Sequence, residues 1–266
     1  MSIFEGFVFR RGDSPIHRLD PRVKFLYTVL MLVLAVMFSE MPILLILFLS
    51  QVPLVVAAGV QRSWAKTMRG SVFLALLIFF TNLATRWAYA NFTLHPVYLE
   101  ESVAMTLRFL TLVESFSVFS LTTSPDDLSL AMERVGIPYW FCFAFTTSIR
   151  LMPALARDAQ TIINAQKSRG LELERGNLLR RVRNYIPILI PLIVTTIRRS
   201  LELAEAMESR AWGATENRTS LTELRMKTSD YITLALLSAL LLVGVYVRLY
   251  VKIPRLVDLI PYAIKP

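Results

Sequence analysis

Long apolar runs, separated by one extended hydrophilic interval, restrict the folds open to this chain more than any other feature. A helix needs about 20 mostly apolar residues to cross a bilayer, where it satisfies its own backbone hydrogen bonds. The composition agrees, since 55% of the 266 residues are hydrophobic and 18% are charged, whereas soluble domains carry about 25% charged residues. We therefore expect an all-α integral membrane protein, a helical bundle of about five spans over the runs 25–38, 41–60, 72–84, 103–121 and 231–247.

The hydrophilic interval divides the chain into three parts. Residues 1–121 are expected to form the N-terminal transmembrane helices, and 231–266 a C-terminal transmembrane helix with its tail. Between them, residues 122–230 are expected to form a cytoplasmic or interfacial region of long amphipathic helices. The short apolar stretch 139–145 is too short to span, so it should lie at the interface or pack against the bundle.

Basic residues orient the bundle. Arginines and lysines before the first run and in the loop 61–70 place the N-terminus in the cytoplasm, because cytoplasmic loops carry the excess of positive charge. The expected location is the cytoplasmic membrane, crossed several times. The C-terminus then lies outside, against the indication of four basic residues, Arg248, Lys252, Arg255 and Lys265. Cytoplasmic loops also explain the net charge of +9, and no nucleic-acid partner is expected because no recognition motif accompanies that charge.

Two similar tripeptides lie inside the hydrophilic interval. Ser168-Arg169-Gly170 follows a helical pattern that contains Leu155 and Ile162, and Ser209-Arg210-Ala211 follows a second one that contains Met207. Each pattern has a proline-containing apolar beginning. Arginine near a helix end also stabilises the helix dipole, by about 0.3–1 kcal/mol, which would explain either tripeptide alone. Two equivalent endings instead favour two docking points, since the guanidinium presents a planar five-donor fork that suits carboxylates.

In these motifs the chain resembles the transmembrane T component of energy-coupling factor (ECF) transporters, the vitamin and metal-ion importers of prokaryotes. The segments that carry the resemblance are Leu19-Asp20-Pro21-Arg22-Val23-Lys24, the stretch 121–128, Gly136-Ile137-Pro138 and the two tripeptides. The family's signature there is Ala-Arg-Gly-like. Here both first positions hold Ser, and Ala211 replaces the second Gly.

The resemblance implies a mechanism. Ser168, Arg169 and Gly170, and likewise Ser209, Arg210 and Ala211, would dock into grooves on two ATP-binding-cassette (ABC) ATPases, one each. The two long helices would carry ATP-driven movement to a separate small membrane protein, the substrate-binding S component. The apolar faces that contain Leu155, Ile162 and Met207 are expected to hold that protein. Specificity for a vitamin or a transition metal would then reside on the S component.

The chain carries no recognisable catalytic motif. No glycine begins the phosphate-binding pattern Gly-x-x-x-x-Gly-Lys-Ser/Thr, so ATP is expected on the partner ATPases and this chain is expected to bind no cofactor. One cysteine and two histidines give no metal-ligand spacing, so no metal site and no enzymatic activity are expected.

Glu114, within the run 103–121, is the strongest polar anomaly. An acid in a membrane span is a functional candidate, although it could instead pair with an arginine such as Arg150. Three alternatives therefore stay open: a self-sufficient secondary transporter that uses Glu114, an integral-membrane enzyme acting on lipids, and the permease subunit of a conventional ABC transporter.

Overall fold

The computed structural model describes residues 14–89, 96–172, 178–214, 224 and 226–251. Within these ranges the chain is helical and contains no β-strand, which confirms the expected all-α class. The helices are α1 (Pro21–Met37), α2 (Met41–Ala58), α3 (Gln61–Tyr89), α4 (Pro96–Thr122), α5 (Pro125–Arg134), α6 (Tyr139–Ser168), α7 (Leu178–Glu208) and α8 (Thr228–Tyr250). The basic residues Arg10, Arg11, Lys252, Arg255 and Lys265, used above for orientation, lie outside the described residues.

The chain forms two compact units. The first comprises residues 1–131 and 224–266, and the second comprises residues 132–223. The expected amphipathic region, 122–230, therefore contains the whole second unit and extends into the first unit at both ends. Helix α5 crosses the division.

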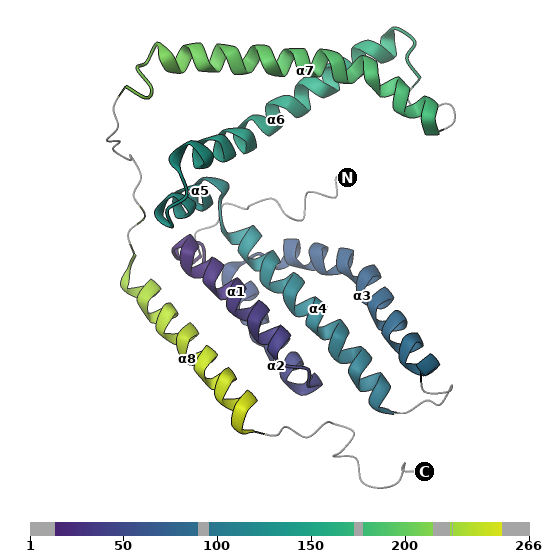
Figure 1. The fold of residues 1–266 in the computed structure, drawn as a ribbon, viewed down its shortest axis with the longest axis vertical. Helices are drawn as coiled ribbons and strands as arrows, with labels where there is room; N and C mark the ends of the chain where they lie inside the picture. Colours follow the sequence, from purple (N-terminus) through teal and green to yellow (C-terminus); the bar gives the residue numbers. More distant parts are fainter. Residues whose placement is uncertain (1–13, 90–95, 173–177, 215–223, 225, 252–266) are drawn as a thin grey trace. The chain divides into compact units, whose positions relative to one another are not determined.

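The first unit is a helical bundle with α4 at its centre. Helix α4 packs against α1, α2 and α3, and α1 packs in addition against α8 (Figure 1). Four helices, α2, α3, α4 and α8, are long and apolar enough to cross a membrane. Helix α1 has 17 residues and is therefore about 26 Å long, slightly less than a hydrocarbon core of about 30 Å.

The first unit has the distribution of polarity that a bilayer requires. Large apolar side chains are exposed on its outside, for example Phe73 and Phe80 on α3 and Leu242 on α8. In contrast, fully buried positions of the bundle include polar residues, among them Gln51 and Thr111. The side-chain amide of Gln51 donates a hydrogen bond to the backbone carbonyl of Thr111 at 3.2 Å. Polar side chains in a membrane protein face the bundle interior because lipid offers them no hydrogen-bond partner.

The second unit is a pair of long helices, α6 and α7. Helix α6 runs without interruption from Tyr139 to Ser168, so the apolar stretch 139–145 forms the first turns of this long helix, and its place at the interface or against the bundle stays a prediction. Residues 139–152 contain neither glycine nor proline that could end a helix, and Pro153 is accommodated inside it. Helix α7 likewise contains Pro187 and Pro191.

Candidate functional site: two arginine-bearing helix ends

Helix α6 ends in a left-handed turn at the first tripeptide. Arg169 is the residue that caps the helix, and Gly170 follows it with a φ of 86°. The amide of Leu171 donates to the carbonyl of Gln166, and the amide of Gly170 donates to that of Lys167, both at 3.0 Å. This pair of hydrogen bonds defines the Schellman motif, which satisfies carbonyls that the helix end leaves free.

Helix α7 ends in the same turn at the second tripeptide. The amide of Trp212 donates to the carbonyl of Met207 at 3.0 Å, and the amide of Ala211 donates to that of Glu208 at 2.9 Å. Ala211 takes the left-handed position with a φ of 58°. The replacement of glycine by alanine in this tripeptide therefore leaves the helix ending unchanged, and Arg210 stands in the same position as Arg169.

Both arginines are exposed at their helix ends. Within the described residues, neither guanidinium takes part in an ion pair or a hydrogen bond. The serines before them turn back to their own helices, because Ser168 Oγ donates to the Asn164 carbonyl at 3.1 Å and Ser209 Oγ to the Ala206 carbonyl at 3.0 Å. Each tripeptide thus offers its arginine to a partner while its hydroxyl is satisfied locally.

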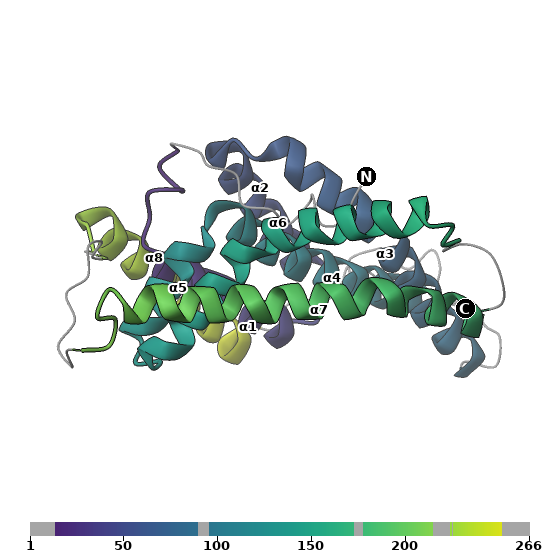
Figure 2. The ribbon, with the colours of Figure 1, turned by 90° about the horizontal axis from the view of Figure 1, so that it is seen from above.

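Contacts between α6 and α7 run antiparallel. The Gln166 side-chain amide donates to the Pro187 carbonyl at 3.2 Å, and an Arg199 guanidinium nitrogen lies 2.9 Å from an Asp158 carboxylate oxygen. At the other end of the pair, the ring of Trp212 lies 5.0 Å from that of Phe143. The two arginine turns therefore lie at opposite ends of the pair (Figures 1 and 2), separated by roughly the length of a 30-residue helix, about 45 Å.

The residues predicted to hold a substrate-binding protein are only partly exposed. Leu155, Ile162 and Met207 are half-buried within the helix pair. A more exposed apolar row lies along α7 with the three- and four-residue spacing of one helix face: Ile186, Leu189, Ile190, Ile193, Val194, Ile197 and Leu201. Among the described residues of the second unit, this α7 row is therefore more exposed than the three predicted residues.

Both arginine turns lie in the part of the chain that matches a known protein family. The sequence model of the cobalt transport protein family, CbiQ, matches residues 12–221. The chain belongs to this family. The match includes both arginine turns and ends before α8.

Curated relatives agree over most of the chain. They are energy-coupling factor transporter transmembrane proteins, EcfT. The protein of Thermosediminibacter oceani is 33% identical over 82% of this chain and 88% of its own length, and that of Streptococcus thermophilus is 32% identical over 89% and 96%. The protein of Clostridium kluyveri is 33% identical over 87% and 91%. Membership among the ECF T components is therefore confirmed, and this family member is a multi-pass membrane protein of transporter type.

Glu114 belongs to the first unit, and both arginine turns belong to the second. Its side chain is fully buried in α4, and neither carboxylate oxygen has a hydrogen-bond partner among the described residues. The Trp64 indole of α3 lies beside it. Arg150, the partner considered from the sequence, is an exposed residue of α6 in the second unit.

Two features of this family member were missed from the sequence. One is the aromatic contact of Trp212 with Tyr139 and Phe143, at 6.3 and 5.0 Å between ring centroids. The other is a set of buried charged residues around Asp20 and Asp230. The Asp-Pro start of α1 is an N-cap signal, but it does not reveal a partner 210 residues away.

Proposed function

We propose that this chain is the coupling subunit of an ECF-type importer, which transmits ATP-driven movement from two ABC ATPases to a substrate-binding membrane subunit. The observation that carries the proposal is the repetition of one exposed arginine turn at opposite ends of one antiparallel helix pair. A pair of equivalent docking points suits a pair of similar partners. The imported substrate would be a vitamin or a transition metal.

Arg169 and Arg210 would each enter an acidic groove on one ATPase. The planar fork of an arginine is pre-organised, so less side-chain freedom is lost for each hydrogen bond formed, and it can make two parallel hydrogen bonds with one carboxylate. ATP would bind and react on the ATPases alone. This chain would contribute no catalytic group and no cofactor.

The S component would bind the apolar surface of the helix pair. The exposed row on α7 supplies most of that surface, and Leu155, Ile162 and Met207 would support it from the half-buried side. An exposed apolar patch of this extent is typical of an interaction site. Movement of either ATPase would then displace the same pair of helices that the S component rests on.

The proposed setting is the cytoplasmic membrane, with the N-terminus and both arginine turns in the cytoplasm. On this orientation Arg248, at the end of α8, lies on the outer side. It pairs there with Glu40, at 3.3 Å between guanidinium and carboxylate, which compensates a charge that would otherwise oppose this topology. In a Cys142→Ser background, Glu40→Cys should react with a membrane-impermeant reagent from outside whole cells, and Ser168→Cys only after lysis.

The central test is a charge reversal at both turns. The variant R169E/R210E should lose the ATPases that co-purify with the wild-type protein. A matched control, R157E/R198E, makes the same change of charge on exposed positions of the same two helices and should retain them. A complex that survives R169E/R210E, or a control that loses its ATPases equally, would contradict docking through the arginine turns.

A further inference from the structure

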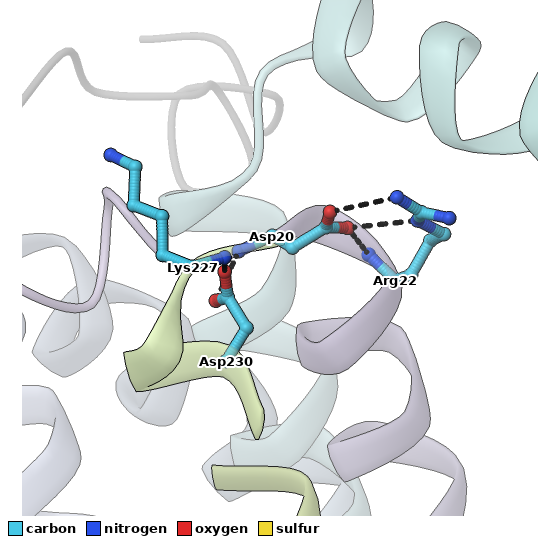
Figure 3. A network of polar contacts seen from close by, with 4 residues as sticks. All are labelled: Asp20, Arg22, Lys227 and Asp230. Carbon is cyan, nitrogen blue, oxygen red and sulfur yellow. Dashed lines mark hydrogen bonds and ion pairs between the residues drawn. The ribbon is translucent and has the colours of Figure 1, made fainter. Parts of the chain in front are cut away.

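Four charged residues, of which all but Arg22 are buried, hold together one end of the first unit. We call Asp20, Arg22, Lys24 and Asp230 the clasp. The Asp230 carboxylate accepts the backbone amide of Asp20 at 3.0 Å through one oxygen, and that of Lys227 at 2.7 Å through the other. Asp20 in turn accepts the backbone amide and two guanidinium nitrogens of Arg22, at 2.9 to 3.1 Å (Figure 3). The starts of α1 and α8 are thereby joined.

Lys24 connects this junction to α4. Its ammonium donates to the carbonyl of Thr122, the last residue of α4, at 2.8 Å, and to the carbonyl of His17 at 3.0 Å. The side chain is buried, and the carboxylates of Asp127, Asp20 and Asp230 attract its charge. The clasp therefore ties three helices, α1, α4 and α8, at the same end of the bundle.

The position of the clasp in the chain is distinctive. The chain leaves the first unit after residue 131 and returns to it at residue 224. Before the second unit, α4 ends at Thr122 and only the short helix α5 follows it in the first unit. After the second unit, the first turn of α8 contains Asp230. On both sides of the helix pair, the nearest long bundle helix, α4 before it and α8 after it, therefore ends or begins at a residue that the clasp holds.

The chemistry of the clasp suits the transmission of movement. Apolar helix contacts can slide by small steps, and the remaining α1–α8 interface is largely apolar, with Leu237 packed among Val23, Leu30 and Leu34. Buried charge-assisted hydrogen bonds have strict geometry, and breaking one leaves a buried polar group unpaired. Buried ion networks also contribute less to stability than to a specific arrangement in several systems.

We propose that the clasp is the point at which displacement of the helix pair is passed to the membrane bundle, with Lys24 and Asp230 as positioning residues. The proposal rests on the coupling function proposed above. With the clasp intact, α4 and α8 move as one body with α1. Without it, each connection moves its own helix, and ATP hydrolysis no longer produces a defined movement of the bundle.

The test uses the complete transporter, purified with its ATPases and S component and reconstituted into vesicles. Asp230→Ala and Lys24→Met should still co-purify the ATPases and hydrolyse ATP at about the wild-type rate. Substrate uptake per ATP hydrolysed should fall by about tenfold or more, the order expected when a buried hydrogen-bonding group loses its partner. Asp230→Asn, which keeps one acceptor oxygen, should give an intermediate ratio.

Leu237→Ala is the matched control, since it weakens the same α1–α8 interface without a polar contact. It should lower thermal stability while its uptake per ATP stays at the wild-type ratio. An unchanged ratio in Asp230→Ala, or an equal fall in Leu237→Ala, would overturn the proposal. Absence of ATPases from the wild-type preparation would instead contradict the coupling function, so the two failures are distinguishable.

A measurement on the wild-type complex keeps the proposal testable if a clasp variant fails to fold. Hydrogen exchange at the backbone amides of Asp20 and Lys227, both bonded to Asp230, should be equally slow in the nucleotide-free and ATP-bound states. Rapid exchange of these amides in either state would show that the clasp opens during the cycle, and the proposal would be wrong.

Discussion

Ala211 takes, at the end of α7, the left-handed backbone position that Gly170 takes at the end of α6, with φ values of 58° and 86°. The two turns have the same hydrogen bonds, although only one has the residue that favours this conformation. A side chain with a Cβ is strained there by about 1 kcal/mol or more. The turn at Ala211 therefore keeps the helix ending of α6 at a cost in stability, as the proposed docking role of Arg210 would require.

Ala211→Gly should therefore stabilise the protein by about 1 kcal/mol, and Gly170→Ala should destabilise it by a similar amount. Space does not limit the second change, because no atom outside the turn lies within 4 Å of an added Cβ at Gly170. Thermal unfolding in detergent, followed by circular dichroism, checks both directions. A lower unfolding temperature for Ala211→Gly would mean that the turn is not the one described.

Replacement of the arginines by lysine separates geometry from charge. Arg169→Lys and Arg210→Lys keep a positive charge at each turn but lose the planar fork. We expect each to weaken ATPase binding by about tenfold, the order of one charge-assisted hydrogen bond, and less than the corresponding glutamate variants do. Titration of purified ATPase against the immobilised protein measures the affinity of each variant and so ranks them. If the lysine variants bound the ATPases as tightly as the wild-type protein, the positive charge alone would explain the docking and the planar fork would not be needed.

Structural features that depend only on residues close together in the sequence could be predicted. The apolar runs indicated membrane helices, and Arg169-Gly170 indicated a helix end, because both signals are local. The sequence reasoning did not show that 139–145 begins α6, because it considered the length and hydrophobicity of this stretch and not the lack of a helix-breaking residue after it. The contact of Trp212 with Phe143 and that of Asp20 with Asp230 join distant segments, and only the packed fold brings these residues together.

Cys142 offers a test of packing at the start of α6. Burial raises the pKa of its thiol, and the Glu133 carboxylate adds to that shift. A raised pKa lowers the thiolate fraction at neutral pH, and the thiolate is the reactive form. We expect slow labelling by maleimide in the folded protein, accelerating only at a pH above that needed for an exposed cysteine. Ser200→Cys in a Cys142→Ser background, at an exposed position of α7, is the control. Equal labelling rates would contradict this burial.

Glu114 distinguishes the coupling subunit from a self-sufficient secondary transporter. Its carboxylate is buried, and no cation balances it among the described residues. An unpaired charge in such a place opposes stability, whereas a neutral group of the same shape does not. Glu114→Gln should therefore keep ATP-dependent uptake within about twofold of wild type and should not lower the unfolding temperature.

The secondary-transport mechanism gives the opposite result, because an ion or proton site loses its charge in Glu114→Gln. Uptake would be abolished in that variant, and wild-type uptake would persist in vesicles that contain this chain without ATPases. Glu114→Ala supplies the comparison for packing, since it removes buried atoms as well and should destabilise the bundle by about 2–4 kcal/mol. If substrate uptake falls only in the variant that loses stability, Glu114 serves the packing of α4 against Trp64. If uptake is lost in Glu114→Gln although the protein stays stable, Glu114 serves transport.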